Sequence, residues 1–414
     1  MSVGDNRDFN PLRSIIVVFL TLVVLAFVYL AGILTGVGAV SLGAGESVGD
    51  VLGRPNQEGA AEQNAEEFQV FWEAWDLIER DFYGEMPSPE ERVQGAIEGL
   101  VWSLNDPYTA YIPPDSAAML REDTSGTYQG IGAYVNEGPE GGVLIVRVFE
   151  GGPAEEAGIQ DGDIVVAADG EDLTLLTLDE SILLIRGPAG APVTLTIYRE
   201  GEEELLEITV TRASLEVPTV EARMLEDNIG YVALFDFNAQ AGTRLRAAVQ
   251  DLMDQGATSL IFDLRGNPGG LLTQAVDVAD LFLPDGVVLT QRDVSGAEQV
   301  YESRNGDFAE EIPMVVLVNG NSISASEVVA GALQDRGRAI LIGETTFGKG
   351  AVQLQHVLSD GSLLLVANAH WFTPNGVSIN GRGITPDIEV TSPEEPGDED
   401  PQLDRAVQYL QAGH

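Results

Sequence analysis

The chain has 414 residues, of which 66 are acidic and 21 basic, giving a formal net charge of −45 at pH 7. This length is sufficient for two or three domains with a sizeable core. The negative charge argues against nucleic acid and anionic membrane surfaces as partners. The absence of cysteine excludes disulfides, thiol nucleophiles and zinc–thiolate sites, and the chain's three histidines argue against a multi-histidine metal site. We therefore expect no cofactor.

An apolar run near the N-terminus predicts a membrane anchor. Residues 15–40 contain no charged side chain and are numerous enough to span a bilayer as a helix. Arginines precede the run and acidic residues follow it, which predicts a cytoplasmic N-terminus. Small residues over 36–44 leave a cleaved signal peptide as an alternative, but the apolar core is longer than is usual for one. We expect a single-pass anchor over residues 1–43 in a bacterial cell membrane, with the remainder outside the cytoplasm.

A linker and a small helical region are expected next. Residues 44–64 are acidic and Gly-rich, as in a linker, and residues 65–121 form the helical region. Apolar residues recur at helical spacing from Phe68 to Ile78 and from Val93 to Val101, which predicts two helices. Pro113-Pro114 is expected to end this region. Two short helices cannot bury these aromatic side chains alone, so we expect packing on the body of the protein or in a homo-oligomer.

Residues 122–213 read as short strands separated by glycine turns. Within them, a helix is predicted to start at Pro153 and to be capped by Gly158, a hairpin turn falls at Asp169-Gly170, and a second helix covers Leu178 to Ile185. This order of elements, with its Gly-Pro-Ala sequence, resembles a PDZ domain, which is a partly open β-barrel with two helices.

The PDZ resemblance implies a site for a protein tail. The loop Gly130-Ile131-Gly132 is similar to the loop whose backbone N–H groups bind a terminal carboxylate, while the tail adds a strand to the sheet. A Gly-rich hairpin turn is the structural alternative. Arg186, at the edge of this segment, either links tail binding to activation or is a solvated surface residue.

Residues 214–392 alternate between buried strands and amphipathic helices, which predicts a mainly parallel sheet. An acidic segment followed by a last short helix is expected over residues 393–414. The predicted strands cover residues 229–235, 259–264, 314–318, 351–357 and 363–372, and the predicted helices cover residues 239–255, 271–283 and 402–411.

Lys349 is the only lysine in the chain, all other basic residues being arginine. Arginine stays protonated in proteins, whereas a buried lysine can lose its proton and act as a base. Acting near neutral pH would require burial to lower its pKa by roughly 3 units. A stray lysine in an arginine-preferring genome is the alternative. In the following strand, Gln353 lies on the same side by the two-residue period and could hold the lysine or a nucleophile in place.

Serines gather where the strand over residues 314–318 gives way to a helix. Ser324 and Glu327 have the spacing of a capping box, which is a structural role. A hydroxyl at a helix N-terminus also lies beside free N–H groups that can stabilise an oxyanion. The glycines of Asp263 to Gly270 could bring another N–H to a substrate carbonyl, or this segment is only a tight loop.

Three segments, Ile261 to Gly270, Val318 to Glu327 and Gly343 to Lys349, resemble the carboxy-terminal processing peptidases, also called tail-specific proteases. The resemblance runs from about Phe68 to Leu410. It implies a multidomain α+β protein whose protease core has the ClpP/crotonase-like α/β fold. The resemblance implies that Ser324 is the nucleophile and that Lys349 is its general base, with Gln353 as the partner of the base. It also implies that Ala325 and either Gly269 or Gly270 donate N–H groups to the oxyanion, and that Asp335 is structural.

The sequence thus predicts a membrane-anchored serine endopeptidase that recognises the free, small or apolar C-terminal tails of exported proteins through its PDZ domain. Cleavage would use a Ser324–Lys349 dyad. A catalytically silent tail-binding adaptor is the alternative from another functional class. A non-peptidic acyl hydrolase fits the dyad but leaves the PDZ domain unexplained.

Overall fold

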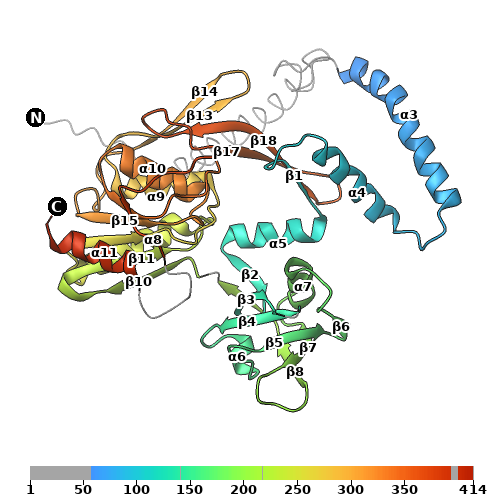
Figure 1. Ribbon diagram of the computed structural model, residues 1–414, viewed down its shortest axis with the longest axis horizontal. Coiled ribbons are helices and arrows are strands. Elements are labelled where there is room, and N and C mark those ends of the chain that lie inside the picture. The colour runs from blue at the N-terminus through green and yellow to red at the C-terminus, as the bar shows by residue number, and fades with distance from the viewer. Residues whose placement is uncertain (1–56, 140, 217, 393–399, 414) are drawn as a thin grey trace, which may run out of the picture. The chain divides into compact units, whose positions relative to one another are not determined.

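The computed structural model describes residues 57–139, 141–216, 218–392 and 400–413 (Figure 1). The predicted membrane anchor over residues 1–43 lies outside these ranges. Within them, the helices are all too short or too polar to cross a membrane. The chain divides into two units between Ser88 and Pro89.

Helix α3 (Gln57–Asp81) belongs to the first unit and confirms the helix predicted from aromatic spacing. The ring of Phe71 contacts those of Phe68 and Trp72, with centroids 5.8 and 5.1 Å apart. Phe68, Trp72 and Ile78 are nevertheless 51%, 56% and 54% exposed. A strip of apolar side chains therefore remains accessible along this helix.

The second unit begins with α4 (Pro89–Trp102), β1 (Ala110–Ile112) and α5 (Pro114–Ser125). The prediction that Pro113-Pro114 ends the helical region is wrong, because Pro114 opens α5. Proline is well suited to the first helical turn, since the N–H that it lacks would have no partner inside the helix. Helix α5 leads directly into the segment predicted to be a PDZ domain.

That segment contains a six-stranded sheet, a two-stranded sheet and two helices. Its elements are β2 (Thr127–Gly130), β3 (Ala133–Glu137), β4 (Val143–Val148), α6 (Pro153–Glu156), β5 (Ile164–Ala168), β6 (Glu171–Asp172), α7 (Leu178–Ile185), β7 (Pro192–Tyr198), β8 (Leu206–Thr211) and β9 (Ala213–Glu216). The large sheet has the order β3-β4-β5-β7-β8, β6 pairs with β5, and β2 pairs with β9. Both predicted helices are confirmed, and so is the turn at Asp169-Gly170, whose φ angles are 49° and 89°.

A second six-stranded sheet forms the centre of the C-terminal part. Its order is β10-β11-β12-β15-β16-β19, and all neighbours are parallel except β10 and β11. This confirms the predicted mainly parallel sheet. The elements are β10 (Val220–Met224), η1 (Glu226–Asn228), β11 (Ile229–Leu234), α8 (Ala241–Asp254), β12 (Ser259–Asp263), α9 (Leu272–Phe282), β15 (Met314–Val318), α10 (Ala325–Asp335), β16 (Ile340–Gly343), β19 (Ile388–Glu389) and α11 (Pro401–Gln411).

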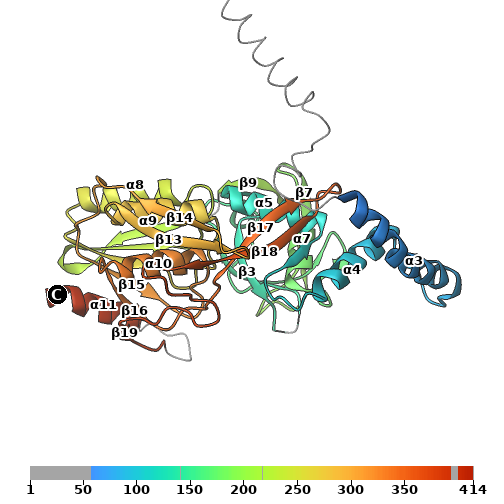
Figure 2. The same ribbon diagram turned by 90° about the horizontal axis from the view of Figure 1, so that it is seen from above.

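Both faces of this sheet are covered, which explains why its strands read as unbroken apolar runs. Along β11, Val232 and Leu234 pack into the cluster that includes α8, α9 and α10. The alternate residues Tyr231 and Ala233 pack into a cluster that includes Ala406 of α11. Figure 2 shows α11 on the opposite side of the sheet from α8 and α9.

A separate antiparallel sheet joins the N-terminal part of this unit to its C-terminal part. Strand β18 (Leu363–Phe372) pairs with β1 through its first residues, with β13 (Gly286–Asp293) through its last, and with β17 (Ala351–Val357) along its length. Strand β14 (Glu298–Ser303) extends the sheet as a hairpin partner of β13. The sequence predicted β17 and β18 but not β13 and β14. Strand β17 begins two residues after Lys349, so this sheet positions that residue.

Candidate functional site

The predicted nucleophile Ser324 lies at the N-terminus of α10, just after β15 of the parallel sheet. Its φ of 56° and ψ of −109° form a conformation that non-glycine residues rarely adopt. The preceding loop holds it there. Oγ of Ser322 donates to the Leu264 carbonyl at 2.8 Å. The N–H of Ile323 donates to the Asn267 carbonyl at 3.0 Å. Local strain maintained by surrounding contacts is frequent at functional sites.

The glycine loop after β12 lies directly against Ser324. A Cβ atom on Gly269 would be 2.9 Å from Cβ of Ser324, so that only glycine fits. The N–H of Gly269 donates to Oδ1 of Asn267 at 2.9 Å. Among the hydrogen bonds of the described residues, none uses the N–H of Gly270 or Ala325. Of the two glycines that the sequence left open, Gly270 is therefore the one with a free donor.

Lys349 lies in the turn before β17 and is half-buried. Burial lowers the pKa of its ammonium group, which is the direction that a base requires. Its carbonyl accepts a hydrogen bond from Nε1 of Trp371 at 3.1 Å, and this contact fixes the turn. No hydrogen bond within the described ranges joins Nζ of Lys349 to Oγ of Ser324.

Glu327 connects the serine segment with the lysine segment. Its side chain is fully buried, and Oε2 accepts the N–H groups of both Ser324 and Lys349 at 2.9 Å. Oε1 accepts the N–H of Gly348 and the hydroxyl of Thr346, each at 2.6 Å. The sequence predicted only the contact within its own helix turn. The contacts to residues about twenty positions away carry no local sequence signal.

Ser324 opens into a cavity of about 230 Å³. Ala325, Gly270 and Gln353 also line this cavity, together with apolar side chains such as Trp371. The amide of Gln353 donates to the carbonyl of Tyr108 and not to Lys349 or Ser324. The structure thus brings Gln353 to the cavity but gives its amide a partner in the N-terminal part of the second unit.

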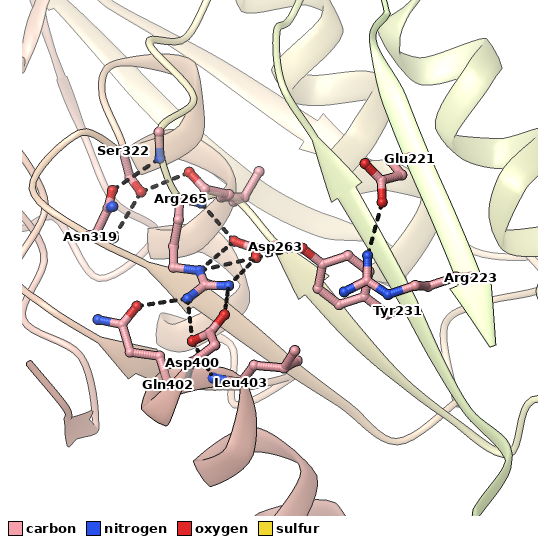
Figure 3. Close-up of polar contacts among 12 residues, drawn as sticks. Glu221, Arg223, Tyr231, Asp263, Arg265, Asn319, Ser322, Asp400, Gln402 and Leu403 are labelled. Atoms are coloured by element: carbon pink, nitrogen blue, oxygen red, sulfur yellow. Dashed lines mark hydrogen bonds and ion pairs between the residues drawn. The ribbon is translucent and has the colours of Figure 1, made fainter. Parts of the chain in front are cut away.

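The glycine loop is also tied to the C-terminal helix through Arg265 (Figure 3). The guanidinium lies between two carboxylates, with Nη2 2.6 Å from Oδ2 of Asp263 and 2.8 Å from Oδ2 of Asp400. Its Nη1 donates to Oε1 of Gln402 at 3.0 Å, and the Tyr231 hydroxyl donates to Asp263 at 2.8 Å. Burial acts to raise the pKa of Asp400, but hydrogen bonds from Arg265 and the backbone outweigh it and keep that pKa below its ordinary value. The sequence reasoning missed this network, since its partners are far apart in the chain.

The predicted tail-binding loop lines a second cavity, of about 250 Å³, which β3 and α7 also border. Gly132 has a φ of 84°, so the turn depends on glycine. In the described part of the chain, the N–H groups of Ile131 and Gly132 donate no hydrogen bond. The N–H groups that the sequence assigned to a tail carboxylate are therefore free, whereas Gly130 lies at the end of β2.

Arg186 is part of this second cavity and is not a solvated surface residue, because its side chain is only 24% exposed. Its Nη1 lies 2.8 Å from Oδ1 of Asp123, and its guanidinium lies over the ring of Tyr128 at 4.7 Å. Asp123 belongs to α5, so Arg186 joins the predicted PDZ domain to the helix before it.

Asp335, for which the resemblance implies a structural role, and two of the three histidines lie outside both cavities. Asp335 ends α10 and accepts the N–H of Asn375 at 2.9 Å, which is a structural contact. His356 and His370 are exposed on β17 and β18. Across the described residues, no group of three His, Asp or Glu side chains is placed to hold a metal ion.

Three segments of the chain match known sequence families. Residues 228–390 match the family described as peptidase family S41. Residues 144–199 match the PDZ domain family, and residues 39–116 match the family described as the activating protease CtpB N-terminal domain.

Individual proteins are similar over most of their length. The chain is 38% identical over 325 residues to a carboxy-terminal-processing protease of Bartonella bacilliformis, covering 77% of this chain and 74% of that one. It is 38% identical over 324 residues to a carboxyl-terminal-processing protease of Synechocystis sp., covering 77% and 76%. An S41 protease structure from Bacteroides fragilis aligns with a TM-score of 0.52 and 20% identity, covering 80% of this chain and 92% of that one, a likeness of fold alone.

Proposed function

Because the chain belongs to the carboxy-terminal processing proteases of peptidase family S41, we propose that it is a membrane-anchored endopeptidase that cleaves with a Ser324–Lys349 dyad. Its substrates are exported proteins whose C-terminal tails bind the PDZ domain. The observation that carries the dyad is the cavity in which Ser324 lies beside two free N–H groups. The backbone N–H of the half-buried Lys349 donates to the carboxylate of Glu327, which also accepts the N–H of Ser324.

The chemistry follows from these positions. Oγ of Ser324 attacks the carbonyl carbon of the peptide bond as Nζ of Lys349 takes the hydroxyl proton. The N–H groups of Ala325 and Gly270 stabilise the oxyanion, and the lysine ammonium then protonates the leaving amine. Water activated by the neutral lysine releases the acyl group from Ser324. The serine–lysine hydrogen bond forms when substrate is bound, since such contacts are often long in free enzymes.

Gln353 has a supporting role in this proposal. Its NH₂ group donates to the carbonyl of Tyr108, which leaves the amide oxygen and the second N–H to orient Lys349 or Ser324. The core that carries these residues has, in this proposal, the ClpP/crotonase-like α/β fold. The parallel sheet with helices on both faces supports it.

Two further parts of the proposal concern location and assembly. The charge-free run over residues 15–40 supports a single membrane-spanning anchor, with the protease outside the cytoplasm. The exposed aromatic side chains of α3 support a homo-oligomer formed through the N-terminal helical region, because an apolar strip of this kind is usually covered by a partner.

The test is cleavage of an unstructured polypeptide that ends in apolar residues, with a free or an amidated C-terminus. The full chain, Ser324→Ala and Lys349→Arg are compared in detergent. We expect only the unsubstituted enzyme to cleave, and the free-ended substrate to be preferred. Cleavage that persists in either variant would refute the dyad, and equal cleavage of the amide would remove tail recognition. Tail binding without cleavage by any of the three proteins would favour the adaptor.

A further inference from the structure

The loop between α4 and β1 contacts strand β17 at Gln353. The NH₂ group of Gln353 donates to the carbonyl of Tyr108 in this loop. The hydroxyl oxygen of Thr109 accepts the N–H of Ala367 at 3.2 Å. Ala367 is the residue of β18 that pairs with Gln353 in the register of the two strands. The loop therefore holds both the side chain of Gln353 and its neighbour across the sheet.

Asp106 fixes the conformation of this loop. Its Oδ2 accepts the hydroxyl and the N–H of Thr109, the N–H at 3.0 Å, and its Oδ1 accepts the N–H of Tyr108 at 3.3 Å. The hydrogen bond from the Thr109 hydroxyl lowers the pKa of Asp106 below its ordinary value, so the carboxylate is charged at neutral pH. The carbonyl of Tyr108 and the N–H of Thr109 belong to one planar peptide group. By holding that N–H, Asp106 also fixes the direction of the carbonyl.

The carbonyl of Tyr108 in turn determines which end of the Gln353 amide faces the loop. A carbonyl oxygen only accepts hydrogen bonds, so it pairs with the NH₂ group and would repel the amide oxygen. Among the residues that the structure describes, no hydrogen bond uses the amide oxygen of Gln353. Because Gln353 and Ser324 line the same cavity, this oxygen is a free acceptor on a side chain of the active site.

We propose that Asp106 is a positioning residue of the active site. Through the carbonyl of Tyr108 it orients the amide of Gln353, whose oxygen then accepts an N–H of the Lys349 ammonium. This inference rests on the proposed serine–lysine mechanism. The ammonium formed when Ser324 gives up its proton has three N–H groups, and an amide oxygen of fixed orientation can accept one of them. A loosened loop would let the amide turn and would make the productive arrangement rarer.

The experiment is a double-mutant cycle on kcat in the full chain. Asp106→Ala removes three hydrogen bonds, Gln353→Ala removes the amide, and a third variant carries both changes. Asp106→Asn tests for rescue, because its amide oxygen can still accept the two donors that Oδ2 accepts. Asp293→Ala is the matched control. Asp293 also accepts one hydroxyl and two N–H groups, from Ser295 and Ala297, in the turn between β13 and β14.

We expect Asp106→Ala and Gln353→Ala each to lower kcat about tenfold, with KM for a free-ended polypeptide unchanged. The double variant should also lose about tenfold and not about a hundredfold, because both changes remove the same contact. Asp106→Asn should restore most of kcat, and Asp293→Ala should keep it. A purely structural role of the loop would instead give independent effects that multiply.

Three results would overturn the inference alone: unchanged kcat in Asp106→Ala or Gln353→Ala, single effects that multiply in the double variant, or an equal fall in Asp293→Ala. If Asp106→Ala does not fold, Thr109→Val takes its place in the cycle, because it removes the hydroxyl that donates to the carboxylate at nearly constant volume. Cleavage that persists in Ser324→Ala would refute the dyad itself, which separates failure of the mechanism from failure of the positioning role.

Discussion

Replacing Glu327 by Gln should disturb both halves of the candidate active site at once. The carboxylate accepts four hydrogen bonds, two on each oxygen, from the segments of Ser324 and Lys349. A glutamine amide has one oxygen and one NH₂ group, so the NH₂ group must face one of the two pairs of donors. The NH₂ group should face Thr346 and Gly348, because the Thr346 hydroxyl can accept a hydrogen bond instead of donating one. The N–H of Gly348 is then left unpaired.

The size of the effect follows from these contacts. One buried N–H without a partner costs roughly 1–3 kcal/mol, and the three remaining hydrogen bonds lose their charged acceptor. We expect the free energy of unfolding to fall by about 2–4 kcal/mol. Because Ser324 and Lys349 are held through their own N–H groups, small shifts should also lower kcat by about 100-fold.

The measurements are denaturant unfolding and steady-state cleavage of a free-ended polypeptide. Glu310→Gln is the control, because Glu310 also accepts two backbone N–H groups, those of Gly306 and Asp307, in a loop outside the active-site cavity. The control should lose some stability but keep kcat. Unchanged kcat in Glu327→Gln, or an equal fall in the control, would show that the shared carboxylate does not position the two residues.

Three further predictions concern titration and the loop contacts. Burial lowers the pKa of Lys349, so the pH profile of kcat/KM should rise through a midpoint below 10.5 as the amine becomes neutral; a profile flat in pH would contradict its role as base. Burial, followed by the charge of a neighbouring aspartate, raises the pKa of Asp236 in the tail cavity to about 6. Its ionisation should repel a tail carboxylate, so the affinity for tails measured by anisotropy should fall as pH rises through about 6, and Asp236→Asn should remove this dependence. Asp400→Asn should weaken the hold on Arg265 and lower kcat about tenfold with unchanged tail affinity, and a stopped-flow assay showing an unaltered acylation rate would exclude a link from α11 to the glycine loop.

The elements that the sequence predicted well are those with strong periodicity or a strong stop signal. Helix α7 starts at Leu178 and ends at Ile185 as expected, because Thr177 caps it and Gly187 follows its end. The strands of the parallel sheet are buried on both faces and so appear as continuous apolar runs. The sequence does not predict helix α5, because Pro113-Pro114 resembles a stop signal, although the second proline suits a helix start.

The hairpin of β13 and β14 was missed for a different reason. Glu298 to Ser303 is largely exposed and polar, so the alternation that marks a half-buried strand is weak. Its stability comes from pairing with β13, which in turn pairs with β18, some eighty positions further along the chain. Pairing of this kind is fixed by tertiary contacts and leaves little trace in a local window.

In the candidate site too, local sequence identifies contiguous motifs but not the contacts between distant residues. Short motifs indicated Ser324, Lys349 and the paired glycines, because each motif is contiguous in sequence. The hydrogen bonds that position them are not contiguous: the contacts of Glu327 with the lysine turn, and of Arg265 with α11, join distant segments.

The two-residue period predicts that Gln353 lies on the side of Lys349, but the pairing of β17 is irregular between Val352 and Gln353. Gln353 lines the cavity that Ser324 enters. Its amide nevertheless binds Tyr108, a residue that no period in β17 could identify. Sequence patterns can therefore identify candidate reacting groups, whereas the relative position of these groups depends on contacts between distant segments. For this reason Glu327→Gln tests the arrangement of the site more directly than replacement of Ser324 or Lys349, because it keeps both reacting side chains and weakens only the hydrogen bonds that position them.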